Sequence, residues 1–187
     1  MNKKILTIAL ITPILLLAGN AKDKIEEPST KLEMVTQVKG SILVKGYQQI
    51  GSTMYGKYSN SLKVDVYEFN NIKTKTKTYG LNIEVDNNEK YNSTASSFVD
   101  YEEISSLIKG LEYIEAISKN PTKLKNYEAI YKTNGGLEIT NFNSSSGNLV
   151  AVQAGRYSTK SIYLELSQVK DLKSILNEAY NKIKSLK

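Results

Sequence analysis

The last third of the chain, residues 155–187, has the pattern of one strand that runs directly into one amphipathic helix. A similar pattern occurs 65 residues earlier. At that offset, residues 98–101 align with residues 163–166. The apolar helix positions that follow also align: Ile104, Leu107 and Leu111 with Val169, Leu172 and Leu176. Internal similarity at a fixed offset is typical of a repeated structural unit. The match predicts two versions of one unit, in which several strands are closed by a helix.

The strands of the first unit are predicted from alternation of apolar and polar residues, which is the period of a strand with one buried face. Asn70-Asn71 and Asp86-Asn87-Asn88 supply turn residues between them. Glycines and tyrosines interrupt residues 46–58, for which the sequence predicts either a bent strand or a loop. The predicted strands are residues 32–38, 41–45, 62–66, 73–78 and 79–85.

Lys73, Lys75 and Lys77 alternate with threonines over residues 73–78. In a strand, this alternation places the three lysines on one face. Two interpretations are open. The lysines form a cationic ladder that binds an anionic polymer or a membrane surface, or they protect an edge strand against aggregation.

Helices are predicted at the end of each unit. Asp100 and Glu103 have the spacing of a capping box, apolar residues follow with helical spacing up to Ile117, and Asn120-Pro121 ends the helix. In the second unit, Asn134-Gly135 predicts a tight hairpin with two positive φ angles, and further short connections predict an antiparallel meander. Ser167 is the predicted cap of the last helix. The fold class is therefore α+β: antiparallel sheets with two helices, in a tandem arrangement of strands then helix.

The start of the chain has the pattern of an export signal. Two lysines precede an apolar run over residues 5–17, and the small residues Gly19 and Ala21 follow. The run is shorter than the roughly 20 residues that a membrane-spanning helix needs. We expect a signal peptide at residues 1–21, a flexible tether at 22–30 and a single globular domain at 31–187, with subunits at 31–119 and 126–187. No transmembrane helix is expected after signal removal.

Leu17-Ala18-Gly19 resembles the end of a bacterial lipoprotein signal, in which the next residue is the cysteine that carries the lipid. Asn20 occupies that position, and the chain contains no cysteine. Either ordinary signal cleavage releases the protein, or Asn20 replaces a lipidated cysteine. Both alternatives predict an exported protein, which is periplasmic, envelope-associated or secreted.

The composition excludes several chemistries. The chain has no histidine and no cysteine, which excludes serine–histidine–carboxylate triads, cysteine nucleophiles and metal sites built on either residue. Its glycines form neither a phosphate-binding loop nor a dinucleotide fingerprint, so no cofactor is predicted. Carboxylates remain for an enzyme such as a glycan hydrolase, and the candidates are Asp100, Glu102, Glu103 and Glu165. The first three also suit a helix N-terminus, where negative charge is favourable.

Binding is the preferred interpretation. Arg156 is the only arginine and lies between Gly155 and Tyr157 at a predicted turn, where a guanidinium can hold a carboxylate or phosphate with two hydrogen bonds. Thirteen tyrosines and no tryptophan favour contact with sugars or proteins. We expect a noncatalytic exported protein that binds a protein or glycan partner in the envelope or outside the cell. The candidate binding residues are Arg156, Tyr157, Lys73, Lys75 and Lys77.

The arrangement of strands and then a helix, with residues 161–176 as its ending, also resembles PUR-repeat, PC4-like and Whirly proteins. That resemblance implies binding of single-stranded nucleic acid. The export signal argues against it. The positive charge is almost entirely lysine, as in proteins from AT-rich bacterial genomes, so the basic composition adds little support for nucleic acid.

Overall fold

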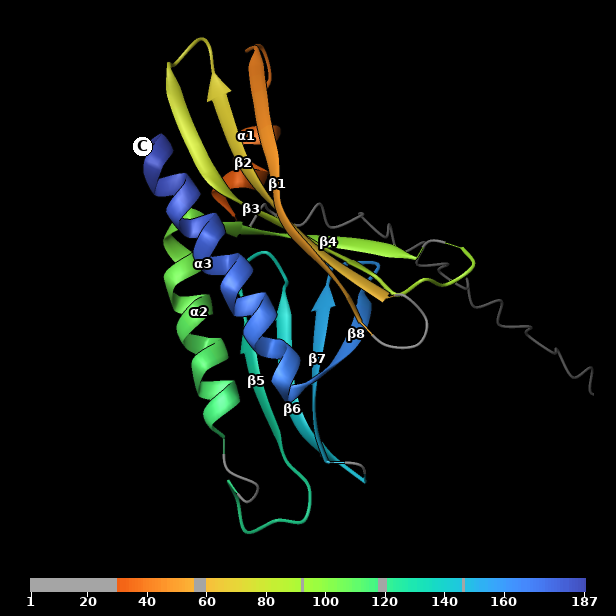
Figure 1. Ribbon diagram of the computed structural model, residues 1–187. Helices are drawn as coiled ribbons and strands as arrows, with labels where there is room; N and C mark the ends of the chain where they lie inside the picture. Colours follow the sequence, from red (N-terminus) through yellow and green to blue (C-terminus); the bar gives the residue numbers. More distant parts are fainter. Residues whose placement is uncertain (1–29, 56–59, 92, 118–120, 146) are drawn as a thin grey trace, which may run out of the picture.

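Two four-stranded antiparallel sheets form most of the molecule, and a long helix follows each sheet in the sequence (Figure 1). The computed structural model describes residues 30–55, 60–91, 93–117, 121–145 and 147–187. The predicted signal peptide, Asn20 and nearly all of the predicted tether lie outside these ranges. The α+β class is confirmed, and so is the element order of strands then helix, which occurs twice.

The first sheet has the strand order β1-β2-β3-β4, and the second has the order β5-β6-β7-β8. All neighbouring strands are antiparallel, as the predicted meander requires. A short helix, α1, precedes the first sheet. The first unit contains α1 (Lys31–Thr36), β1 (Leu43–Tyr55), β2 (Asn60–Asn71), β3 (Thr76–Asp86), β4 (Thr94–Asp100) and α2 (Tyr101–Ala116). The second contains β5 (Glu128–Lys132), β6 (Glu138–Ser144), β7 (Gly147–Ala154), β8 (Lys160–Glu165), the 3-10 turn η1 (Leu166–Gln168) and α3 (Val169–Leu186).

One continuous hydrophobic core joins the two units. Helices α2 and α3 lie side by side (Figure 1), and their apolar faces are buried together with residues of both sheets. Val64 and Leu81 of the first sheet and Val152 and Ile162 of the second are at most 1% exposed. Because both helices cover the same core, each unit completes the burial of the other.

The same kind of capping pair recurs after 65 residues, first at the start of α2 and then at the start of η1, which leads into α3. At α2, the Asp100 amide donates to Glu103 Oε2 at 3.4 Å. At η1, the Glu165 amide donates to Gln168 Oε1 at 2.8 Å. The predicted capping box at Asp100 is confirmed. The predicted cap at Ser167 is wrong, because the chain first forms η1 with Glu165 as its cap, and Ser167 lies inside that turn.

Helix α1 occupies part of the segment predicted as the strand at residues 32–38. Its capping box decides the structure: the Glu33 amide donates to Thr30 Oγ1 at 3.0 Å, and the Thr30 amide donates to Glu33 Oε2 at 3.2 Å. Leu32 is fully buried and packs with Tyr67 and Phe69 of β2. The prediction failed because so short an apolar pattern also fits one helical face.

The lysine-threonine segment is a turn for half of its length, so the predicted six-residue strand is wrong. The Asn71 side chain reverses the chain, because its Oδ1 accepts from the amides of Lys73 at 3.1 Å and Thr74 at 3.2 Å. Lys75 completes the turn with a φ of 56°. Strand β3 then pairs with β2 from Thr76 onward, but its pairing with β4 begins only at Gly80. Lys77 therefore lies where β3 is an edge of the sheet, which fits the edge-strand interpretation for this lysine.

The hairpin predicted at Asn134-Gly135 forms, but its backbone differs from the prediction. Of the three loop residues Asn134, Gly135 and Gly136, only Gly136 has a positive φ, of 82°. The Gly136 amide donates to the Thr133 carbonyl at 3.2 Å, and the Thr133 amide donates to the Leu137 carbonyl at 2.9 Å. This is the three-residue hairpin loop that ends with a left-handed glycine.

Candidate functional site

Arg156 connects helix α1 to the β5–β6 hairpin. Its Nη2 lies 3.2 Å from Glu33 Oε2 in α1 and donates to the Asn134 carbonyl in the β5–β6 hairpin at 3.0 Å. The side chain is 20% exposed and lines a hollow of about 460 Å³. In the structure, the carboxylate beside this arginine belongs to Glu33 of the same chain. Tyr157, the next residue, is 78% exposed.

Replacing Arg156 with alanine is expected to lower the free energy of unfolding by about 1 kcal/mol, because the substitution removes a largely buried ion pair and a hydrogen bond. Chemical denaturation followed by circular dichroism measures the change. Lys132→Ala is the control, since Lys132 forms an ion pair with Glu138 at 2.7 Å but is 64% exposed. Equal effects of the two substitutions would contradict a structural role for Arg156.

The predicted lysines lie in another part of the fold. Lys73 and Lys75 are exposed in the β2–β3 turn, at the free end of the first sheet (Figure 1). Lys77 lies on β3, where its Nζ is 3.2 Å from Glu68 Oε1. The structure therefore brings Lys73 and Lys75 together but does not place them with Arg156 and Tyr157.

The predicted carboxylates at the start of α2 also have structural contacts. Asp100 is 6% exposed, and its two carboxylate oxygens accept from the amides of Lys31 and Leu32. Glu102 lies 2.8 Å from the Lys31 ammonium, whose hydrogen bond lowers the pKa of that carboxyl below its usual value. Glu103 Oε1 accepts from the Asn134 amide at 3.0 Å. These three acids join α1, α2 and the β5–β6 hairpin.

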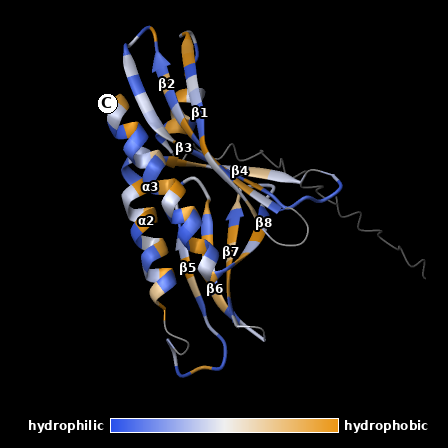
Figure 2. Ribbon diagram, in the orientation of Figure 1, coloured by the Kyte–Doolittle hydropathy of each residue, from blue (hydrophilic) through white to orange (hydrophobic). Residues whose placement is uncertain are grey.

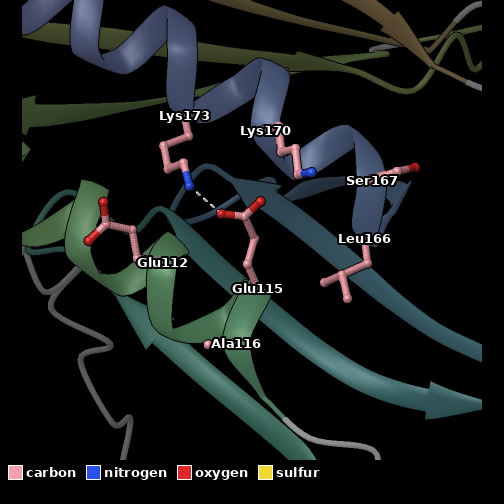
Figure 3. Close-up of a pocket in the computed structure, with 7 residues that line it drawn as sticks. All are labelled: Glu112, Glu115, Ala116, Leu166, Ser167, Lys170 and Lys173. Atoms are coloured by element: carbon pink, nitrogen blue, oxygen red, sulfur yellow. Dashed lines mark hydrogen bonds and ion pairs between the residues drawn. The ribbon is translucent and has the colours of Figure 1, made fainter.

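A groove of about 570 Å³ lies between the end of α2 and the beginning of α3 (Figure 3). Its two acids, Glu112 and Glu115, come from one helix, and Glu115 forms an ion pair with Lys173 across the groove. Glycoside hydrolysis needs two carboxylates that flank a substrate from opposite sides. Asp100 cannot supply the second one, because it lies at the other end of α2, roughly 20 Å away at 1.5 Å per residue. The Lys173–Glu115 pair instead ties α2 to α3.

The outer face of β5–β8, opposite the helices, is the candidate binding surface. Alternate residues of these strands enter the core, and the others face outward. Five of the outward-facing residues are apolar or aromatic and lie in two neighbouring rows of the sheet. Tyr163 is 58% exposed and Ile130 is 50% exposed. The Phe142 and Tyr163 rings meet edge to face, with centroids 6.3 Å apart. We call this surface the outer aromatic face; it consists of Ile130, Phe142, Leu149, Ala151 and Tyr163.

Acidic residues surround the outer aromatic face. The register places Glu128 opposite Phe142 and Glu165 opposite Leu149. Glu138 and Lys132 form a cross-strand pair beside them. Sequence reasoning anticipated an exposed sheet face but did not find these residues. The sequence does contain a pattern that predicts this surface, because the strands of the second unit carry apolar residues at both even and odd positions.

No protein-family model matches the chain, and no curated protein matches it significantly. In the described part of the chain, no cluster of three or more acidic side chains is placed to hold a metal ion. No helix among those same residues is long and apolar enough to cross a membrane. The fold and surface define an α+β protein with two antiparallel sheets and one exposed aromatic sheet face.

Proposed function

We propose that the protein is a noncatalytic exported protein that binds another component of the envelope or of the extracellular space through the outer aromatic face. The observation that carries this proposal is the exposure of Tyr163 and Ile130 on a regular sheet. Aromatic side chains that remain half exposed on a rigid surface are typical contact residues of protein interfaces. Export is the expectation from residues 1–21 and is part of the proposal.

The chemistry of the face favours a protein partner. Its centre is mainly apolar and aromatic, with Thr140 between Ile130 and Ala151. Its border carries Glu128, Glu138 and Glu165 against Lys132. A complementary partner presents an apolar patch with lysines or arginines around it, because complementary charges steer encounter and fix orientation. A glycan would instead use the tyrosine ring as a stacking platform. The acidic border gives the protein partner the better electrostatic match.

Combined Ile130→Ser and Tyr163→Ser substitutions are expected to abolish capture of the partner in a crosslinking pull-down from the envelope fraction. The fold should be retained, because both side chains point away from the core. Tyr113→Ser is the matched control, since Tyr113 is an exposed tyrosine on α2. A double variant that captures as well as the unmodified protein would contradict the proposed surface, as would the absence of any partner. Capture of glycan alone would replace the protein partner with a carbohydrate.

Single-stranded nucleic acid is the second candidate ligand. The observation in its favour is the twofold order of four strands and a helix, which is the arrangement of the PUR-repeat, PC4-like and Whirly proteins. Nucleic acid binding depends mainly on lysines and arginines that neutralise phosphates. The outer aromatic face has the opposite charge, with Glu128, Glu138 and Glu165 against one lysine. This face is therefore better suited to a basic protein than to a nucleic acid.

A further inference from the structure

The first sheet extends past the end of the helix that covers it. The Tyr79 hydroxyl donates to the Leu186 carbonyl at 3.3 Å, which places the last turn of α3 beside the row Gly46–Glu68–Tyr79. The next row on the same face, which contains Val44, lies beyond the helix. Figure 1 shows the ends of β1, β2 and β3 projecting from the body of the molecule.

Apolar side chains are exposed on this projecting end. The Ile72 amide donates to the Ile42 carbonyl at 3.0 Å, which holds the two isoleucines next to each other. Ile42 is 69% exposed and Ile72 is 48% exposed. Val38 and Val44 nearby are about half exposed. Figure 2 shows this apolar character at the beginning of β1.

Positive charge surrounds these apolar residues. The two segments that form the projecting end, residues 34–45 and 70–78, contain five lysines and no acidic residue. Lys77 pairs with Glu68, and Lys45 lies over the rings of Tyr47 and Tyr67. Lys39, Lys73 and Lys75 are exposed, and no ion pair holds them within the described ranges. We call this end the basic tip; it consists of Val38, Lys39, Ile42, Val44, Ile72, Lys73 and Lys75.

The basic tip is a preorganised structure. Asn71 is 4% exposed, and its Oδ1 accepts from the Lys73 and Thr74 amides and from Ser41 Oγ at 2.6 Å. These bonds fix the β2–β3 turn against the segment that leads into β1. Ile42, Ile72 and the lysines are therefore presented together, and less conformational entropy is lost when they bind.

We propose that the basic tip docks on a membrane surface rich in anionic lipids, with Ile42 and Ile72 between the headgroups and Lys39, Lys73 and Lys75 against the lipid phosphates. Exposed apolar side chains flanked by lysines are the composition that binds an anionic bilayer surface. The acidic border of the outer aromatic face would be repelled by the same lipids.

This inference does not depend on the proposed function, because it uses another surface. If both hold, the lipid contact leaves the outer aromatic face accessible to its partner. Failure at the tip leaves the experiment on Tyr163 unaffected, and the reverse is also true.

The chain has no tryptophan, so a single tryptophan reports on its own surroundings. In the full chain, Ile72→Trp is expected to show a blue-shifted emission with vesicles of phosphatidylcholine and phosphatidylglycerol. High salt should reverse the shift, and phosphatidylcholine alone should not produce it. Tyr163→Trp is expected to show no shift. Because the reporter is local, membrane contact by the apolar run at residues 5–17 does not produce the Ile72→Trp signal.

Combined Lys73→Ser and Lys75→Ser substitutions in the Ile72→Trp chain are expected to weaken vesicle binding roughly 25-fold, since each lysine near an anionic surface contributes roughly fivefold. Lys123→Ser with Lys125→Ser is the matched control, because these exposed lysines have the same spacing at the opposite end of the molecule. That control should bind normally. Ile42→Trp is a second reporter, in case Ile72→Trp does not fold.

Three results would overturn the proposal. The first is the absence of a shift at both reporters with anionic vesicles at low salt. The second is an equal shift for Tyr163→Trp, or an equal loss for the two lysine pairs. The third is a response of the tip reporters to an oligothymidylate and not to vesicles, which would assign the lysines to nucleic acid.

Discussion

Asp100→Ala is expected to lower the free energy of unfolding by about 3 kcal/mol, one of the two largest effects that we expect from a single substitution. The buried carboxylate accepts from the Lys31 amide at 2.8 Å and the Leu32 amide at 3.1 Å. A hydrogen bond to a charged group contributes about 1.5–3 kcal/mol, and the substitution leaves an amide buried without an acceptor. It also removes negative charge from the N-terminus of α1. Urea denaturation followed by circular dichroism measures the loss.

Glu102→Ala is the control for Asp100, because Glu102 lies in the same helical turn but its pair with Lys31 is more than half exposed. We expect a loss of less than about 1 kcal/mol from this control. Asp100→Asn should fall between the two, since an amide oxygen can replace only one acceptor. A similar stability for Asp100→Ala and Glu102→Ala would show that Asp100 does not hold α1.

Gly135→Ala is expected to cost about 3 kcal/mol, because the added methyl group has no space. A Cβ on Gly135 would lie 1.8 Å from the Phe98 carbonyl oxygen, which belongs to the backbone of β4 and cannot rotate away. The β5–β6 hairpin would have to move off the first sheet. Thermal and urea denaturation of the variant measure this cost.

Gly40→Ala is the matched control for Gly135. Gly40 has a φ of 71°, but a Cβ there meets nothing within 4 Å. The control therefore isolates the cost of a left-handed alanine, about 1 kcal/mol. Equal losses at the two positions would mean that the hairpin adapts and that its contact with β4 contributes little stability.

The sequence predicted the larger elements because local and long-range signals agreed in them. The capping pair Asp100/Glu103 and the apolar helical spacing that follows it both predicted α2, and the apolar stripe after Ser167 predicted α3 although its cap was misplaced. The meander of β5–β8 followed from short connections that leave strands few ways to pair. The fold class could therefore be predicted from the sequence alone.

The errors arose where a single side chain decides the backbone. Thr30 and Glu33 turn a short apolar stretch into α1, and Asn71 turns a regular lysine-threonine alternation into a reversal. Gly136 selects the hairpin geometry although Asn134-Gly135 favours another one. In each case the sequence pattern was present, but one residue with a side-chain hydrogen bond or a left-handed backbone determined a different local structure.

The candidate site was less predictable than the fold. Arg156 was chosen as a lone arginine at a turn, yet the residue that it contacts is Glu33, which is distant in sequence. Tyr163 and Phe142 come into contact only through strand register, and Ile42 meets Ile72 through the pairing of β1 with β2. Such groupings require the three-dimensional arrangement of the strands.

Because the two units share one core, they should stay associated when the chain between them is cut. Since α2 and α3 pack against each other and against both sheets, their contacts do not require the peptide link between the units. A protease that cuts at the exposed residues 121–125 would leave two fragments that stay together as a noncovalent complex. Neither fragment could bury its helix alone, so each would depend on the other as the two subunits of an obligate heterodimer do.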